Sequence, residues 1–225
     1  MLGQSIRQNT LGLALFAVMT AGLIAFTQLE TKARITENVR LAKSQALHEI
    51  ITLDMHDNEL LDDTVKVEDP RLVLDEGPQD AYIARNKEKA VAVILPTIAP
   101  DGYTGKIKSI VGLSADGTII GVRVLEHQET PGLGDKIEIK KSNWIKQFNG
   151  KSLNSPVHEK WAVKKDGGYF DQMTGATVTP RAVVKSIHQA LIYFEEKRAM
   201  LLTDKARNDS IPKVTSTQQG QQDEH

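Results

Sequence analysis

The chain has 225 residues and a formal net charge of −1. That length allows one medium domain plus an anchor, and the balanced charge gives no sign of the basic face that nucleic-acid binding requires. The absence of cysteine excludes disulfides, thiolate iron–sulfur ligation, CxxC zinc sites and thiol nucleophiles. The six histidines show no i,i+4 pairing, so we predict no metal site. Redox chemistry would therefore need an organic cofactor or non-thiolate metal ligands.

The first predicted element is a membrane-spanning helix. Residues 10–27 read TLGLALFAVMTAGLIAFT without a charge, and a helix of that length is about 27 Å long, which matches the bilayer core. A signal peptide would have a shorter apolar core and a cleavage site of small residues, whereas bulky Phe26 and Leu29 stand here. We therefore predict a short cytoplasmic N-terminus over residues 1–9 and an uncleaved anchor in the lipid bilayer over residues 10–28. Arg7 and the α-amine precede the span and four basic residues follow it, so the basic count points against a cytoplasmic N-terminus. Long domains can translocate regardless of such counts, so the count does not decide the orientation.

The next elements are a helix, an irregular stretch and a strand. Residues 29–53 carry apolar side chains at intervals of three and four, which predicts a helix that continues from the membrane. Residues 54–80 are acidic, and we predict no regular element there. Residues 90–95 form a β-like run that Pro96 is expected to close.

A β-hairpin follows. Asp116 and Gly117 stand between two β-branched runs, residues 107–113 and residues 118–125. Asp-Gly between such runs is a strong hairpin signal because glycine accepts the positive φ of a tight turn.

The C-terminal third is predicted to hold turns and one long helix. Lys136 is interpreted as an exposed strand lysine, although it could neutralise a phosphate. Residues 166–168 read Asp-Gly-Gly and predict a turn. An amphipathic helix is expected to begin near Pro180 and to end about Leu202.

These elements together predict an α+β fold. One N-terminal transmembrane helix precedes a small, mostly antiparallel sheet with flanking helices, and the domain extends over residues 29–203. Residues 204–225 are polar and are expected to be a disordered tail.

The start of the C-terminal helix has the properties of an anion site. Thr179 is a good N-cap residue, and Pro180 is favoured at the first helical position. A helix N-terminus presents free N–H groups and the positive end of a dipole, which together accept phosphate. Arg181 and Lys185 follow on the same helix.

The loop before this helix adds hydroxyl groups. Gly175 and Ala176 have little side-chain bulk and allow a close backbone approach, while Thr174 and Thr177 supply hydroxyls that can bind a phosphate or be esterified to one. Two other interpretations remain open from the residues alone. The segment can simply cap a helix, with Asp171 and Thr174 closing the turn, or it can bind a phosphate reversibly for an unknown purpose.

The sequence Asp171-x-x-Thr174-Gly175-Ala176-Thr177 resembles the flavinylation motif of a known family. This is the covalent FMN-binding domain of the G subunit of Rnf-type electron-transport complexes and of the C subunit of sodium-pumping NADH:quinone reductase. The resemblance implies that Thr177 carries FMN through a phosphodiester bond, which a dedicated flavin transferase makes from FAD with magnesium. The other four residues would then serve in recognition and in shaping the loop.

A second segment, about 40 residues upstream, resembles the same family's ETPGLG loop. In that family the loop lies against the flavin, which implies flavin contacts from Glu129, Thr130, Gly132 and Leu133; the full segment here is Glu129-Thr130-Pro131-Gly132-Leu133-Gly134. A simple turn between strands is the alternative. Residues 102–105, Gly-Tyr-Thr-Gly, also fit the family's pattern but are less specific.

The resemblance also implies a place and a role. It puts the domain on the periplasmic side of the cytoplasmic membrane, with other membrane, iron–sulfur and flavin subunits as partners. No catalytic acid, base or nucleophile is evident, so FMN would relay electrons between subunits of an ion-translocating complex. The alternatives are a stand-alone anchored flavoprotein reductase, and a non-redox module that binds a phosphorylated ligand. Turnover by the isolated domain would favour the former, and flavin that survives denaturation would exclude the latter.

Overall fold

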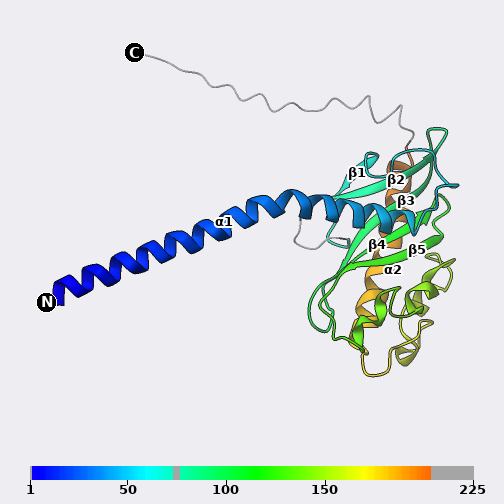
Figure 1. The fold of residues 1–225 in the computed structure, drawn as a ribbon. Helices are drawn as coiled ribbons and strands as arrows, with labels where there is room; N and C mark the ends of the chain where they lie inside the picture. Colours follow the sequence, from blue (N-terminus) through cyan, green and yellow to red (C-terminus); the bar gives the residue numbers. More distant parts are fainter. Residues whose placement is uncertain (1, 73–76, 204–225) are drawn as a thin grey trace, which may run out of the picture. The chain divides into compact units, whose positions relative to one another are not determined.

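The computed structural model describes residues 2–72 and 77–203 (Figure 1). The chain divides into two compact units, residues 1–45 and residues 46–225. The predicted disordered tail, residues 204–225, lies outside the described residues, as does most of the apolar Leu-Val-Leu run that begins at Leu72.

The first element is one long helix, α1 (Leu2–His48). The predicted continuation of the anchor helix is confirmed as far as His48, and the following residues turn back. Within residues 9–48 this helix is long and apolar enough to cross a membrane, by length and composition. Its apolar side chains between Leu11 and Leu29 are exposed.

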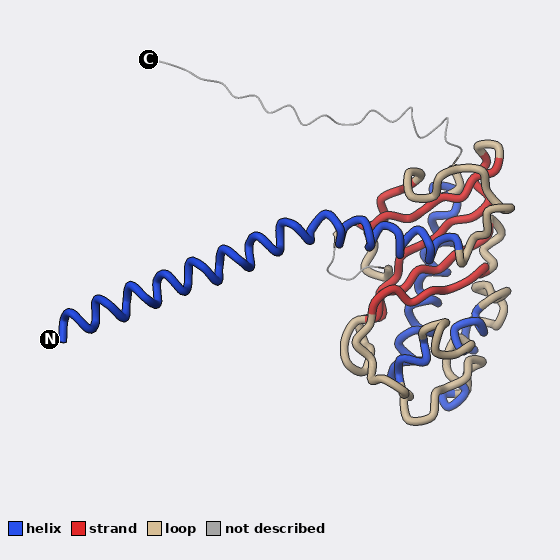
Figure 2. The backbone as a smooth tube through the Cα atoms, viewed as in Figure 1, coloured by secondary structure: helices blue, strands red, loops and turns tan. Residues whose placement is uncertain are grey.

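The second unit is built on a five-stranded antiparallel sheet in simple chain order. Figure 2 shows the strands side by side. The predicted hairpin is confirmed, because β4 pairs with β5 around a turn in which Gly117 has φ +87°. The strands are β1 (Thr64–Val67), β2 (Gln79–Asn86), β3 (Lys89–Ala99), β4 (Ile107–Ser114) and β5 (Ile119–Glu126).

The first two strands were not predicted from the sequence. β1 lies within residues 54–80, where no regular element was expected, and β2 lies mostly after them. In β1 and β2 the charged residues face each other across the ladder, where Lys66 pairs in register with Asp80 and their side chains are 2.9 Å apart. A short, charged strand suits the edge of a sheet because it discourages pairing with other chains. The four-residue β1, with the charged Lys66, therefore fits the edge of the sheet.

The strand expected to end at Pro96 continues through it to Ala99. Pro96 pairs with Ile110 of β4, while the register of β3 with β2 stops at Ile94. The missing N–H of proline therefore falls outside the β2–β3 ladder. A proline is tolerated in a strand at such a position.

Both faces of the sheet are buried. One face packs against α2 (Val178–Leu201), whose apolar stripe joins a large core with strand residues such as Val93 and Val111. The opposite face packs against the end of α1 and the chain after it, through Leu47 and Ile51. This arrangement confirms the predicted α+β class with an antiparallel sheet and flanking helices.

The chain between β5 and α2 forms four short 3₁₀ helices instead of another strand. Lys136, expected in a strand, lies half-buried in η1, and the predicted turn at 166–168 is confirmed by Gly167 at φ +81°. Two backbone hydrogen bonds, between Ile119 and residues 150–151, cover the edge of β5 with this region. The four helices are η1 (Gly134–Ile137), η2 (Trp144–Phe148), η3 (His158–Lys160) and η4 (Lys164–Asp166).

Candidate functional site

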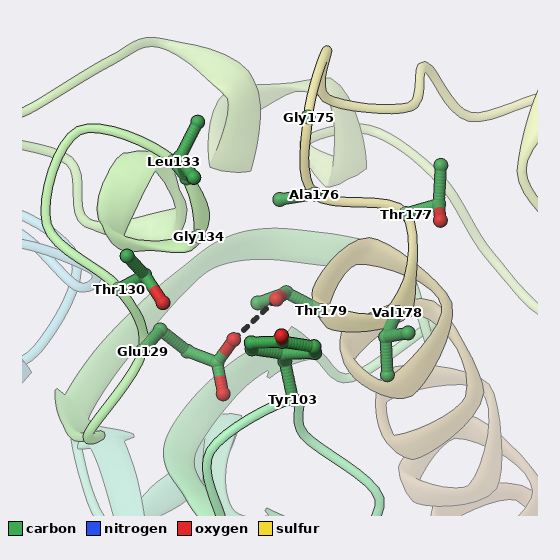
Figure 3. Close-up of a pocket in the computed structure, with 10 residues that line it drawn as sticks. All are labelled: Tyr103, Glu129, Thr130, Leu133, Gly134, Gly175, Ala176, Thr177, Val178 and Thr179. Carbon is green, nitrogen blue, oxygen red and sulfur yellow. Dashed lines mark hydrogen bonds between the residues drawn. The ribbon is translucent and has the colours of Figure 1, made fainter.

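Three segments far apart in the sequence enclose a pocket at the start of α2. Its volume is about 280 Å³. Figure 3 shows the loop after β5 on one side, the loop before α2 on the other, and Tyr103 between them. The lining residues are Tyr103, Glu129, Thr130, Leu133, Gly134, Gly175, Ala176, Thr177, Val178 and Thr179.

The loop after β5 is closed by its own backbone. The Thr130 carbonyl accepts hydrogen bonds from the N–H groups of Leu133 and Gly134, each at 3.1 Å. Gly132 has φ +79° and its N–H donates to the Asp135 carboxylate at 2.8 Å. These bonds fix a tight turn that leads directly into η1. Gly132 is exposed and does not line the pocket, whereas Thr130 and Leu133 do.

Glu129 is the buried carboxylate of the site. It is only 4% exposed, and among the described residues that line the pocket it carries the only formal charge. Its Oε1 accepts from the Thr104 N–H at 3.1 Å, and its Oε2 accepts from the hydroxyl of Thr179. The His127 ring accepts from the Glu129 N–H at 3.0 Å. The side chain therefore points into the protein, toward the first turn of α2.

The loop before α2 makes a turn that needs glycine. Ala176 N–H donates to the Met173 carbonyl at 3.1 Å, and Gly175 between them has φ +82°. A Cβ on Gly175 would lie 2.9 Å from the Leu133 side chain. The two loops thus approach each other as closely as a glycine permits.

Thr177 stands at the junction of this loop and the helix. It is half-buried, lines the pocket and makes no side-chain capping hydrogen bond. The prediction that Thr179 is the N-cap is wrong, because α2 begins at Val178 and Thr177 occupies the capping position. The physical reason is that the Thr179 hydroxyl is taken by buried Glu129. Pro180 still falls in the first turn, where its missing N–H costs no helical hydrogen bond.

Asp171 and Thr174 lie outside the pocket lining. Both are exposed, and the Asp171 carboxylate pairs with Lys164 at 2.5 Å. The pKa of Lys164 is raised because its ammonium donates to this carboxylate. The backbone of Asp171 is held on both sides, by the Trp144 indole N–H at 2.6 Å and by the Gln147 side chain at 2.8 Å. This end of the motif is thus anchored through its main chain.

The basic residues noted near the helix start also point elsewhere. Arg181 makes two 2.6 Å hydrogen bonds to Asp166, which lower the pKa of that carboxyl. Lys185 pairs with Asp101 at 3.0 Å. Among the described residues, then, the pocket lining contains no lysine or arginine. Positive potential at the site has to come from the N-terminus of α2.

The structure adds four lining residues to the predicted set. Gly134 was quoted only as the end of its motif and Tyr103 only within the weak Gly-Tyr-Thr-Gly pattern, while Thr179 was assigned to capping. Val178 had no signal in the sequence. Tyr103, Leu133 and Val178 are 68%, 41% and 40% exposed, so the pocket has a rim of exposed apolar surface. Six predicted residues do line the pocket, namely Glu129, Thr130, Leu133, Gly175, Ala176 and Thr177.

Comparison with known proteins places these segments in a family. The FMN-binding domain family matches residues 102–192, and the RnfG N-terminal region matches residues 1–50. The G subunit of the ion-translocating oxidoreductase complex of Pseudomonas aeruginosa is 51% identical over 199 residues, 88% of this chain and 93% of that protein. Its counterpart in Shewanella piezotolerans is 46% identical over 200 residues, 89% of this chain and 94% of its own length.

Among solved structures, NqrC of Shewanella oneidensis covers 66% of this chain and 72% of its own, with 21% identity and a TM-score of 0.43. The assignment rests on the two G subunits, which are 51% and 46% identical to this chain over 88% and 89% of its length. The chain belongs to the family of G subunits of ion-translocating oxidoreductase complexes.

Proposed function

We propose that this protein is a membrane-anchored electron-transfer subunit that carries FMN on Thr177 through a phosphodiester bond. One observation carries the proposal. Half-buried Thr177, whose side chain makes no capping hydrogen bond, lines a pocket within the matched FMN-binding domain, at the N-terminus of a 24-residue helix.

The start of α2 suits the phosphate of the cofactor. The first N–H groups of a helix lack intrahelical partners, and the dipole there favours negative charge. Thr177 immediately precedes these groups. A phosphate esterified to its hydroxyl would lie beside them, which is the usual position of anions bound at helix N-termini.

The rim of the pocket suits the flavin ring. Tyr103, Leu133 and Val178 expose apolar surface that a planar aromatic ring would cover. The volume of about 280 Å³ is just below the roughly 300–1,000 Å³ found for small-molecule sites. The pocket therefore holds part of the cofactor and leaves an edge open to a partner subunit.

We expect attachment to require a second enzyme, since the one carboxylate among the described lining residues, Glu129, faces Thr179 and not Thr177. In the proposed step the Thr177 oxygen attacks the FMN-side phosphorus of FAD, the pyrophosphate P–O bond breaks, and AMP leaves while the hydroxyl proton passes to the transferase or solvent. Magnesium would offset the phosphate charge. The exposed Asp171 and Thr174 stand at the outer end of the loop, where a transferase can reach them.

Once attached, FMN supplies reversible one-electron exchange with neighbouring carriers. The chain's own residues hold the ring against the apolar rim, keep the phosphate at α2 and prevent the cofactor from diffusing away. Its partners would be the membrane, iron–sulfur and flavin subunits of the complex. Residues 10–28 of α1 would anchor the domain on the periplasmic side of the cytoplasmic membrane.

The test is the mass of the denatured full-length chain from a host with an active flavin transferase, beside Thr177→Ala. We expect the wild type to gain the mass of FMN less water and the variant to gain none. Fragmentation of the tryptic peptide 166–181 then locates the modified hydroxyl, since this peptide contains Thr174, Thr177 and Thr179. An unmodified wild type, or FMN on another hydroxyl, would contradict the proposal.

A further inference from the structure

The buried carboxylate of Glu129 links two segments of the site that are 50 residues apart in sequence. Oε2 accepts the hydroxyl proton of Thr179, which lies in the first turn of α2 and is fully buried. Oε1 accepts from the Thr104 N–H at 3.1 Å. The single hydroxyl proton of Thr104 goes to the Gln128 carbonyl, the nearer acceptor. Glu129 therefore relies on two neutral donors, one of them on α2.

The packing around this hydrogen bond leaves little space. A Cβ on Gly134 would lie 2.8 Å from Glu129 Oε2 and 3.0 Å from Thr179 Oγ1. No ion pair of Glu129 occurs among the described residues, so a buried charge here is compensated by hydrogen bonds alone. Loss of either donor would leave a buried acceptor unsatisfied, which is costly. The contact is thus a specific junction between the loop and the helix.

Thr177 lies next to this junction in the chain. Thr177 precedes Thr179 by two residues, at the capping position of α2. We infer that Glu129 is a positioning residue: through Thr179 it fixes the first turn of α2 against the loop after β5, and it thereby holds the Thr177 hydroxyl in the pocket wall for attachment of FMN. This inference rests on the proposed function for its consequence, but the Glu129–Thr179 junction itself can be tested without a flavin.

The first experiment measures the initial rate of FMN incorporation into the full-length chain in detergent, with purified flavin transferase, FAD and Mg²⁺. Thr179→Val removes the hydroxyl at nearly constant shape, and Glu129→Ala removes the acceptor. We expect each to slow incorporation by about tenfold, the effect of losing one buried hydrogen bond. The double variant should be no slower than the slower single variant, because both changes remove the same contact.

Two further variants separate positioning from general loss of stability. Thr97→Val removes another buried hydroxyl, which donates to the Ser186 carbonyl of α2 at 3.3 Å; neither residue lines the pocket. It should lower stability and leave the incorporation rate unchanged. Thr179→Ser restores a hydroxyl and should recover the rate lost in Thr179→Val. Wild-type incorporation by Thr179→Val, or an equal loss in Thr97→Val, would overturn the inference.

Amide hydrogen exchange of the unmodified chain distinguishes failure of this inference from failure of the proposed attachment. Thr179→Val should raise exchange about tenfold at Leu133 and Gly134, whose N–H groups donate to the Thr130 carbonyl, whereas Thr97→Val should not. Unchanged exchange at these amides overturns the positioning role whether or not the chain accepts FMN. Raised exchange in a chain that never accepts FMN supports the Glu129–Thr179 junction. In that case only the proposed attachment of FMN to Thr177 is contradicted.

Discussion

At the scale of single residues, His188 on α2 is a buried imidazole without a complete set of partners. It is 8% exposed, and its Nε2 has no hydrogen-bond partner among the described residues. Its ring stacks on Trp161 at 5.2 Å and lies 4.5 Å from the ring of His158. Burial, and secondarily the nearby His158, lowers the pKa of His188 from 6.5 to about 4. The folded protein therefore keeps this ring neutral.

A pH dependence of stability follows from that shift. The unfolded chain binds a proton at His188 below about pH 6.5, whereas the folded chain binds it only below about pH 4. Stability is thus complete above pH 6.5, falls as the pH drops, and has lost about 2 kcal/mol from this group by pH 5. Urea unfolding of the solubilised chain at pH 7.5 and pH 5 measures the loss. His188→Phe keeps a ring against Trp161 and should lose less; equal losses in both proteins would refute the role of His188.

The residues of the site show which part of it the sequence can reveal. The two motifs predicted that Glu129 and Thr177 share a site, because the resemblance carries both segments in the family's order. The motifs could not predict that Glu129 turns away to Thr179, since that contact depends on packing between residues 50 apart. Tyr103 was signalled only by the less specific Gly-Tyr-Thr-Gly pattern, because an exposed aromatic side chain becomes informative only beside a pocket.

At the scale of elements, η2 holds the outer end of the loop before α2, at Asp171. The Trp144 indole N–H donates to the Asp171 carbonyl at 2.6 Å, and the Gln147 side chain accepts from the Asp171 N–H at 2.8 Å. The Trp144 ring also packs edge-on against Phe148 at 5.5 Å in the core. The short helix therefore connects the loop before α2 to the hydrophobic core.

Removal of that hydrogen bond should loosen the loop more than the domain. Trp144→Phe keeps an aromatic ring but loses the donor, so we expect faster amide exchange over residues 171–176 and a stability loss of only about 1 kcal/mol. Trp161→Phe is the matched control, since its indole N–H donates to the Pro156 carbonyl at 3.1 Å in another loop. Equal loosening of residues 171–176 in both variants would show that η2 has no special hold on the motif.

Element prediction succeeded where the signal is local and failed where pairing decides. The hairpin at Gly117 was predictable because the turn needs a positive φ. β1 was missed because a strand of four residues that includes the charged Lys66 gives a weak local pattern, and β3 was cut short because Pro96 is acceptable only through the register of its neighbours. Lys136 was placed in a strand because apolar and polar residues alternate over this short stretch. The backbone hydrogen bonds that form η1 produce no recognisable sequence pattern in so few residues.

At the scale of the whole second unit, Arg85 of β2 connects the chain after α1 to the end of α2. Arg85 is 2% exposed, and its guanidinium donates to Asp63 at 2.7 Å and to the Thr203 carbonyl at 2.9 Å. Asn58 supports this network, since its side chain binds both the Arg85 N–H and the Asp63 carboxylate. Three distant parts of the sequence thus meet at one buried cation.

Removing the cation alone should be severe. Arg85→Met keeps much of the side-chain volume but leaves the Asp63 carboxylate, 11% exposed, without its cationic partner. Breaking a buried ion pair from one side typically costs about 3–5 kcal/mol. We expect a loss of that size in the free energy of unfolding, measured by urea titration of the solubilised chain, with the loss mainly in the midpoint and not in the slope.

Removing both charges separates the value of the pair from the cost of a stranded charge. Arg85→Met with Asp63→Leu no longer buries an unpaired carboxylate, so the double variant should be more stable than Arg85→Met alone. It should still fall short of the wild type, because the Thr203 carbonyl loses its donor. If the double variant is instead the less stable of the two, the carboxylate is not the source of the cost, and Arg85 acts mainly by tying the end of α2 to the sheet.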